Sequence, residues 1–65
     1  MDIMNVREAA DYVRLGVPTL NRFRVTGGGP RYAKLGGAVR YRKTDLDDWI
    51  AGRVVRSTSE ASVAA

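Results

Sequence analysis

The sequence of 65 residues contains no cysteine and no histidine. Without cysteine the chain can form neither a disulfide nor a thiolate zinc site. Without histidine it lacks the commonest metal ligand and the commonest general base. We therefore expect no catalytic residue, no metal site and no cofactor, and we predict that the protein is not an enzyme.

Long hydrophobic runs are also absent. No stretch approaches the roughly 18 uninterrupted apolar residues that a membrane span needs. We therefore predict a soluble, cytoplasmic protein without a membrane partner. A chain of this length forms one domain that buries only about 60% of the surface its unfolded state exposes, which leaves no room for a deep catalytic cleft.

Acidic residues are missing from the middle of the chain, although the net charge is only +4. The cations of this segment, which contains no Asp or Glu, are Arg14, Arg22, Arg24, Arg31, Lys34, Arg40, Arg42 and Lys43. A solvated surface usually mixes both signs of charge, because mixing avoids self-repulsion. These cations coincide with helix and hairpin signals, so they indicate a polyanionic partner. A basic surface that serves only solubility is the alternative interpretation.

Residues 15–25 have the features of the turn and second helix of a helix-turn-helix. Gly16 can precede a helix without side-chain strain, and Pro18 supplies a helical φ where its missing N–H costs nothing. The segment predicts a helix that starts near residue 17, with Leu20 and Phe23 on its buried face. The remaining side chains can hydrogen-bond to base edges and phosphates in a major groove. The candidate DNA-binding residues of this helix are Thr19, Asn21, Arg22 and Arg24.

Two further helices are predicted. Asn5 followed by Glu8 is typical of an N-cap with a reciprocal partner, and the apolar spacing behind it predicts a first helix that ends near Arg14. Thr44 is expected to cap a third helix, whose dipole favours three aspartates in the first turn. These aspartates are Asp45, Asp47 and Asp48, and capping accounts for them without a metal. Trp49, the largest apolar side chain, is expected at the centre of the core.

Three glycines and a proline at positions 27–30 must end the second helix, because they maximise backbone freedom and remove a hydrogen-bond donor. A phosphate-binding loop is excluded, since the segment lacks the Gly-Lys-Ser/Thr ending and no strand precedes it.

A two-stranded hairpin is predicted next, from residues 31–35 and 38–42 joined by Gly36-Gly37. A hairpin beside a helix-turn-helix is a wing. Glycines at its tip allow close approach to a phosphate backbone or a minor groove, where a cation gains from the negative potential. The candidate DNA-binding residues of the wing are Arg31, Lys34, Gly37, Arg40 and Arg42.

Short motifs follow one another along residues 3–52. They are Glu8-Ala9-Ala10-Asp11-Tyr12-Val13-Arg14-Leu15, Thr19-Leu20-Asn21-Arg22-Phe23-Arg24, Gly29-Pro30-Arg31-Tyr32, Lys34-Leu35-Gly36, Val39-Arg40-Tyr41-Arg42 and Asp45-Leu46-Asp47-Asp48-Trp49-Ile50. In this order they resemble the excisionase and AlpA-like family of small winged-helix DNA-binding proteins, which is related in fold to the MerR DNA-binding domain. The resemblance implies a recognition helix in the major groove and a wing over residues 34–40 on the backbone or minor groove.

The chain departs from this family at one point. Similar members often begin the recognition helix with Ser-Pro or Ser-Arg, whereas this chain has Gly16-Val17-Pro18. The helix start therefore lacks a hydroxyl cap and any phosphate contact that a serine would make.

We therefore predict a mainly α protein with a small β-hairpin. It is a winged helix-turn-helix of three helices and a two-stranded wing over residues 1–53, followed by a disordered tail over residues 54–65. The predicted function is sequence-specific binding of double-stranded DNA, in the cytoplasm, by a bacterial or phage-encoded protein of a prophage or mobile element. It is either an excisionase that controls recombination or a small AlpA-like regulator of transcription.

The expected partners are double-stranded DNA, an integrase or other recombinase in the excisionase case, and further copies of the chain on adjacent sites. Copies are expected because so small a module buries little surface on DNA. The alternative function is a protein-interaction adaptor whose basic face docks an acidic protein.

Overall fold

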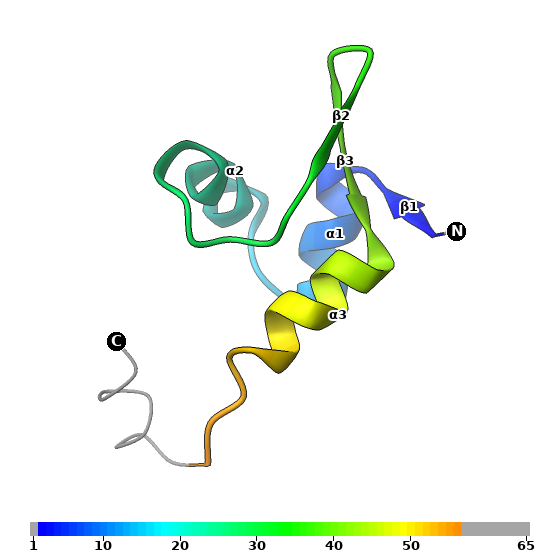
Figure 1. Ribbon diagram of the computed structural model, residues 1–65. Coiled ribbons are helices and arrows are strands. Elements are labelled where there is room, and N and C mark those ends of the chain that lie inside the picture. Colours follow the sequence, from blue (N-terminus) through cyan, green and yellow to red (C-terminus); the bar gives the residue numbers. More distant parts are fainter. Residues whose placement is uncertain (1, 57–65) are drawn as a thin grey trace.

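The computed structural model describes residues 2–56. Its elements, in chain order, are β1 (Ile3–Met4), α1 (Val6–Val13), α2 (Val17–Thr26), β2 (Ala33–Leu35), β3 (Ala38–Arg42) and α3 (Lys43–Ala51). Three helices surround the base of a small sheet, and the β2–β3 hairpin projects away from them (Figure 1). The predicted winged helix-turn-helix fold is confirmed. The predicted tail lies mostly outside the described residues, which end at residue 56.

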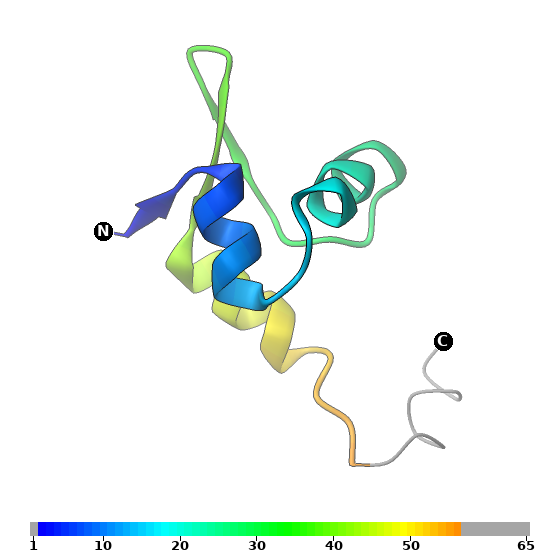
Figure 2. The ribbon, with the colours of Figure 1, turned by 180° about the vertical axis from the view of Figure 1, so that it is seen from behind.

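The first helix has the predicted reciprocal cap. The side chain of Asn5 accepts a hydrogen bond from the backbone N–H of Glu8 at 2.8 Å, and the Glu8 carboxylate accepts one from the backbone N–H of Asn5 at 2.9 Å. The helix stops at Arg14, which adopts a left-handed conformation with φ 63°. This residue turns the chain into the short connection that leads to α2, as seen from behind in Figure 2.

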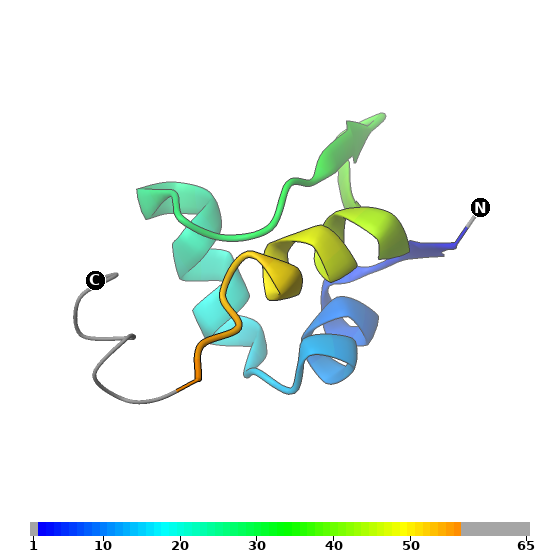
Figure 3. The same cartoon turned by 60° about the horizontal axis from the view of Figure 1, so that its bottom comes forward.

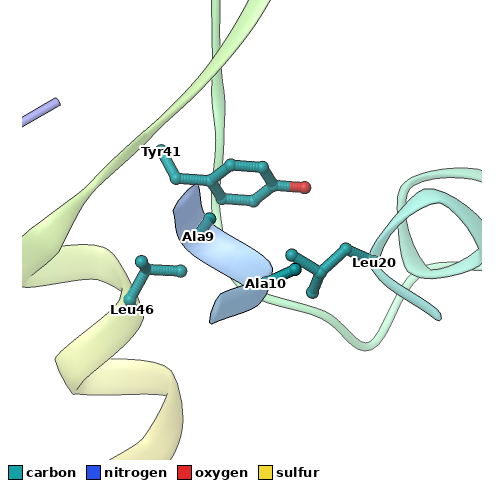
Figure 4. Packing of buried hydrophobic residues seen from close by; sticks show 5 residues of the cluster. All are labelled: Ala9, Ala10, Leu20, Tyr41 and Leu46. Carbon is teal, nitrogen blue, oxygen red and sulfur yellow. The ribbon is translucent and has the colours of Figure 1, made fainter. Parts of the chain in front are cut away.

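The hydrophobic core lies where all three helices meet the base of β3. Its buried residues are Ala9, Ala10, Leu20, Tyr41 and Leu46 (Figure 4). The two small alanines of α1 leave room for the larger side chains of the other elements, and the ring of Tyr41 points from β3 toward α2. The core therefore joins the helix-turn-helix directly to the wing.

The prediction that Trp49 forms the centre of the core is wrong. Trp49 is only partly buried, and its ring makes an edge contact with Phe23 at a centroid distance of 5.7 Å. Its indole N–H donates a hydrogen bond of 2.9 Å to the carbonyl of Gly28. A tryptophan N–H needs a polar partner, which a fully apolar core does not offer. The residue therefore holds the glycine-rich segment after α2, which runs past α3 toward β2 (Figure 3).

The sheet has three antiparallel strands in the order β1-β3-β2, one more than predicted. The added strand pairs Met4 with Tyr41 and Ile3 with Arg42. In the hairpin, the first strand begins at Ala33, so residues 31 and 32 are not part of it. The Gly36-Gly37 turn matches the prediction, since both glycines have positive φ, 59° and 90°, as a tight hairpin turn requires.

The third helix begins two residues earlier than a cap at Thr44 would place it. Arg42 is the N-cap, Lys43 is the first helical residue, and no side chain caps the helix. Thr44 therefore lies inside α3, so its predicted capping role is wrong. The cause is that β3 runs into α3 without a loop, and the N–H of Lys43 donates to the carbonyl of Asp2 at 2.9 Å.

Within residues 2–56, no helix has both the length and the apolar character that a membrane crossing requires.

Candidate nucleic-acid interface

The second helix has one face in the core and one in solvent. Leu20 is fully buried, whereas Asn21 and Arg22 are exposed. Thr19 and Arg24 are half-buried at the border between the two faces. The helix contains no acidic residue. Its solvent face therefore presents hydrogen-bonding groups and positive charge without a competing carboxylate.

Arg22 is an exposed candidate on α2. Within residues 2–56 its guanidinium makes no hydrogen bond and no ion pair, whereas its backbone carbonyl accepts a hydrogen bond from the hydroxyl of Thr26 at 3.0 Å. An arginine presents its donors in a planar fork that matches the acceptor edge of guanine. The structure leaves this fork accessible to a ligand.

Arg24 connects the core to the solvent face. Its Nη1 donates to the hydroxyl of Tyr41 at 3.1 Å, and its Nη2 donates to the Oδ1 of Asn21 at 2.6 Å. Because Arg24 occupies the Oδ1 of Asn21, the side-chain NH2 of Asn21 remains available to donate hydrogen bonds. The geometry thus gives Arg24 a supporting role for Asn21.

The candidate residues of the wing lie on both of its faces. Side chains alternate along a strand, so Val39 and Tyr41 share one face of β3 while Arg40 and Arg42 share the other. Lys34 is paired with Val39 and so lies on the face that contains Tyr41, whose ring points toward α2. Lys34 is exposed, as is Gly37 at the tip of the hairpin. Of the wing cations, Lys34 is thus the one placed on the same side as the core-facing residues.

Arg42 is paired with Asp45 at the base of the wing. Arg42 forms two parallel hydrogen bonds with the carboxylate of Asp45, at 2.8 Å and 2.9 Å. These bonds lower the pKa of the Asp45 carboxyl below its usual value, and the charge of Arg31 adds to the effect. One of the predicted DNA-binding cations, Arg42, is therefore paired with an acid of α3.

Arg40 borders a surface hollow between α1, α2 and β3. The residues that line this hollow are Asn5, Val6, Arg7, Val17, Val39 and Arg40. One guanidinium nitrogen of Arg40 donates to the carbonyl of Val39 at 2.7 Å. Arg7 is exposed and was not among the predicted contact residues. No pattern in the sequence distinguishes Arg7 from a solvated side chain, because its proximity to Arg40 arises only when the strand packs beside α1.

A second cluster of polar side chains ties α1 to α3. The hydroxyl of Tyr12 donates to Asp47 at 2.5 Å, and the ammonium of Lys43 pairs with the same carboxylate at 2.9 Å. These bonds, with that from Tyr12 foremost, lower the pKa of the Asp47 carboxyl. Asp45 and Asp47 therefore serve as partners of cations and of a tyrosine, and capping alone does not account for them. Among residues 2–56 no acidic cluster of a kind that could hold a metal ion is found.

Comparison with known proteins identifies the family of this fold. A family model described as a helix-turn-helix domain matches residues 3–54, a range that contains all of the helices and strands. No curated protein matches the chain.

Proposed function

The chain belongs to the helix-turn-helix domain family, and from this premise we propose that it binds double-stranded DNA in a sequence-specific manner. One observation carries the proposal. The α2 helix buries Leu20 and leaves Asn21 and Arg22 exposed on a face without acidic residues. An α-helix fits the major groove of B-DNA, where amide and guanidinium groups can distinguish base pairs.

Each candidate on α2 receives a distinct role. Arg22 donates both arms of its guanidinium to a guanine, which is the commonest specific contact of arginine. The amide of Asn21 donates to an acceptor on a base edge while Arg24 holds its oxygen. The hydroxyl of Thr19, at the start of the helix, contacts a base or a phosphate.

The wing and the hollow beside it supply contacts to the DNA backbone or the minor groove. Lys34 and Gly37 approach from the exposed part of the hairpin, and Arg40 acts together with Arg7. Such contacts position a protein on DNA and release counterions, but they carry no sequence information. Arg31 and Arg42 add positive charge near the base of the wing, reduced by Asp45.

The resemblance to excisionases and AlpA-like proteins supports a role in a phage, prophage or other mobile element of a bacterium, in the cytoplasm. The protein then acts either as an excisionase, with an integrase as partner, or as a small regulator of transcription. Several copies on adjacent sites would raise its specificity, because one module buries little surface. A footprint over an attachment site supports the first role, and a footprint over the promoter of its own gene supports the second.

The base-reading role of Arg22 is tested by titrating Arg22→Ala and Arg22→Lys against two duplexes of equal length. One is enriched by the wild-type chain from a random-sequence library, and the other is random. We expect Arg22→Ala to weaken the enriched duplex by about tenfold to a hundredfold, as for the loss of a bidentate base contact, and to weaken the random duplex much less.

Arg22→Lys is the matched control, because it keeps the charge and loses the planar fork. It should bind random DNA like the wild type and still lose selectivity. Equal losses on both duplexes would refute the base-reading role. Weak and unselective binding by the wild type, together with a stable complex with an acidic protein, would favour an adaptor instead.

Arg40 is predicted to contact the DNA backbone and therefore to affect all DNA sequences alike. Arg40→Ala should weaken the enriched and random duplexes similarly, and it should reduce the slope of log affinity against log salt by about 0.9 for the lost phosphate contact. Arg7→Ala should behave in the same way, because it lines the same hollow. A loss confined to the enriched duplex would contradict a backbone role.

A further inference from the structure

We propose that Val25 on α2 reads a thymine through the 5-methyl group of that base. This inference rests on the proposed function and adds a specificity-determining residue to it. Val25 is 86% exposed, although it lies within the last turns of a helix that packs on the core.

The fold gives no reason for a valine at this position. Val25 is not among the residues of the core or those packed against it. A β-branched side chain also lowers helix propensity slightly. A single exposed apolar residue is ordinary on a protein surface, however, so exposure alone identifies nothing. The argument depends on where this residue lies.

Val25 lies between the two principal candidates for base contact. Successive residues of an α-helix are about 100° apart, so Val25 is displaced about 40° from Asn21 and about 60° from Arg22 around the helix. It is about 140° away from the buried Leu20. A face that enters the major groove with Asn21 and Arg22 therefore brings Val25 with it.

The chemistry of the side chain then selects the ligand. Valine offers no hydrogen bond, and the methyl group of thymine is the apolar feature that base edges present in the major groove. Val25 lies about 4.5 Å along the helix from Arg22, and base pairs are spaced by about 3.4 Å. The thymine is therefore expected within about two base pairs of the guanine that Arg22 contacts.

The nearby threonines, which also carry methyl groups, are not placed to contact the same thymine. Thr26 follows Val25, but its hydroxyl donates back to the carbonyl of Arg22, which fixes its side chain against the helix. Thr19 lies about 120° from Val25 around the helix axis and so faces a different part of the groove.

The test compares thymine with uracil, which differs only by the methyl group. In the duplex that the wild-type chain enriches from a random library, each thymine is replaced singly by uracil. We expect one replacement to weaken wild-type binding about fourfold, as for one methyl removed from an apolar contact. Val25→Ala should bind the original duplex about fourfold more weakly and should not distinguish it from the uracil duplex.

Two variants serve as controls. Val25→Ile keeps an apolar side chain and should retain the preference for thymine. Val54→Ala removes another exposed valine, which lies outside α2, and should behave like the wild type.

The outcomes separate this inference from the proposed function. If no uracil replacement weakens the wild type, or if Val25→Ala keeps the preference for thymine, Val25 does not read the methyl group. Selective loss by Arg22→Ala would still support the proposed function in that case. If no sequence is enriched at all, the proposed function fails and the inference fails with it.

Discussion

At the scale of single residues, Arg24 joins two side chains from different parts of the molecule. Tyr41, whose hydroxyl accepts one hydrogen bond of Arg24, is buried in the core, and Asn21, which accepts the other, faces solvent. A side chain held in this way loses less freedom on binding than a mobile one. The orientation of Asn21 is therefore set partly from inside the core.

This arrangement predicts a specific effect of Tyr41→Phe. The change keeps the ring that fills the core and removes the acceptor for Arg24, so stability should fall by only about 1 kcal/mol. Selectivity for the base pair that Asn21 contacts should fall several-fold, which is measured by titrating duplexes changed at that pair.

Asn21→Ala provides the reference for this experiment, because it removes the side chain proposed to contact the base. If Tyr41→Phe weakened all duplexes to the same extent, the support role of Arg24 would be contradicted.

Residue types and spacing could predict part of the candidate site. The exposure of Asn21 and Arg22 follows from the position of Leu20 on a helix of known period. The partners of the other candidates could not be predicted. Tyr12 and Asp47 are 35 positions apart and meet only because α1 packs beside α3.

At the scale of the elements, the segment after α2 fits closely against that helix. A Cβ atom at Gly29 would lie 2.4 Å from the Cβ of Phe23. This distance is far below any van der Waals contact, and Phe23 is partly buried against the core. The segment therefore requires glycine at position 29 for space rather than for an unusual φ.

Gly29→Ala is accordingly expected to lower the free energy of unfolding by about 1–3 kcal/mol, as other overpacked sites do. The measurement is urea denaturation followed by Trp49 fluorescence. Gly52→Ala is the control, since its added Cβ would meet its nearest neighbour at an ordinary 3.6 Å. Equal stability of the two variants would show that the contact with Phe23 is relieved at little cost.

The boundaries of the elements were predictable where local signals set them. The cap of α1 by Asn5 and Glu8 and the glycine turn of the hairpin both depend on residues close in sequence. The start of α3 was misplaced because it depends on the strand before it and on the distant Asp2. The short β1 exists only as a partner of β3, so no pattern within two residues could reveal it.

At the scale of the whole molecule, two carboxylates link stability to pH. Hydrogen bonds from Arg42 lower the pKa of Asp45, and those from Tyr12 and Lys43 lower the pKa of Asp47. A carboxyl whose pKa is lower in the folded state stabilises the fold at pH values above its usual pKa of 3.8. This contribution is lost as the pH falls from that value through the lowered folded pKa.

We therefore expect the urea midpoint to fall as the pH is lowered below 3.8, through the lowered pKa values of the two carboxyls. Asp45→Asn should lower the midpoint at pH 7 and make it less dependent on pH. Asp11→Asn serves as the control, because within residues 2–56 the Asp11 carboxylate has no hydrogen bond or ion pair. A midpoint of Asp45→Asn that kept the full acid dependence would assign the effect to other groups.

The division of α2 into a buried and an exposed face has a practical consequence. Positions 21, 22 and 25 contribute little to packing, whereas Leu20 anchors the helix from its other side. A combinatorial library at these three positions should yield folded members at high frequency. If these positions read bases as proposed, the DNA sequence that the chain binds can be changed without redesigning its interior.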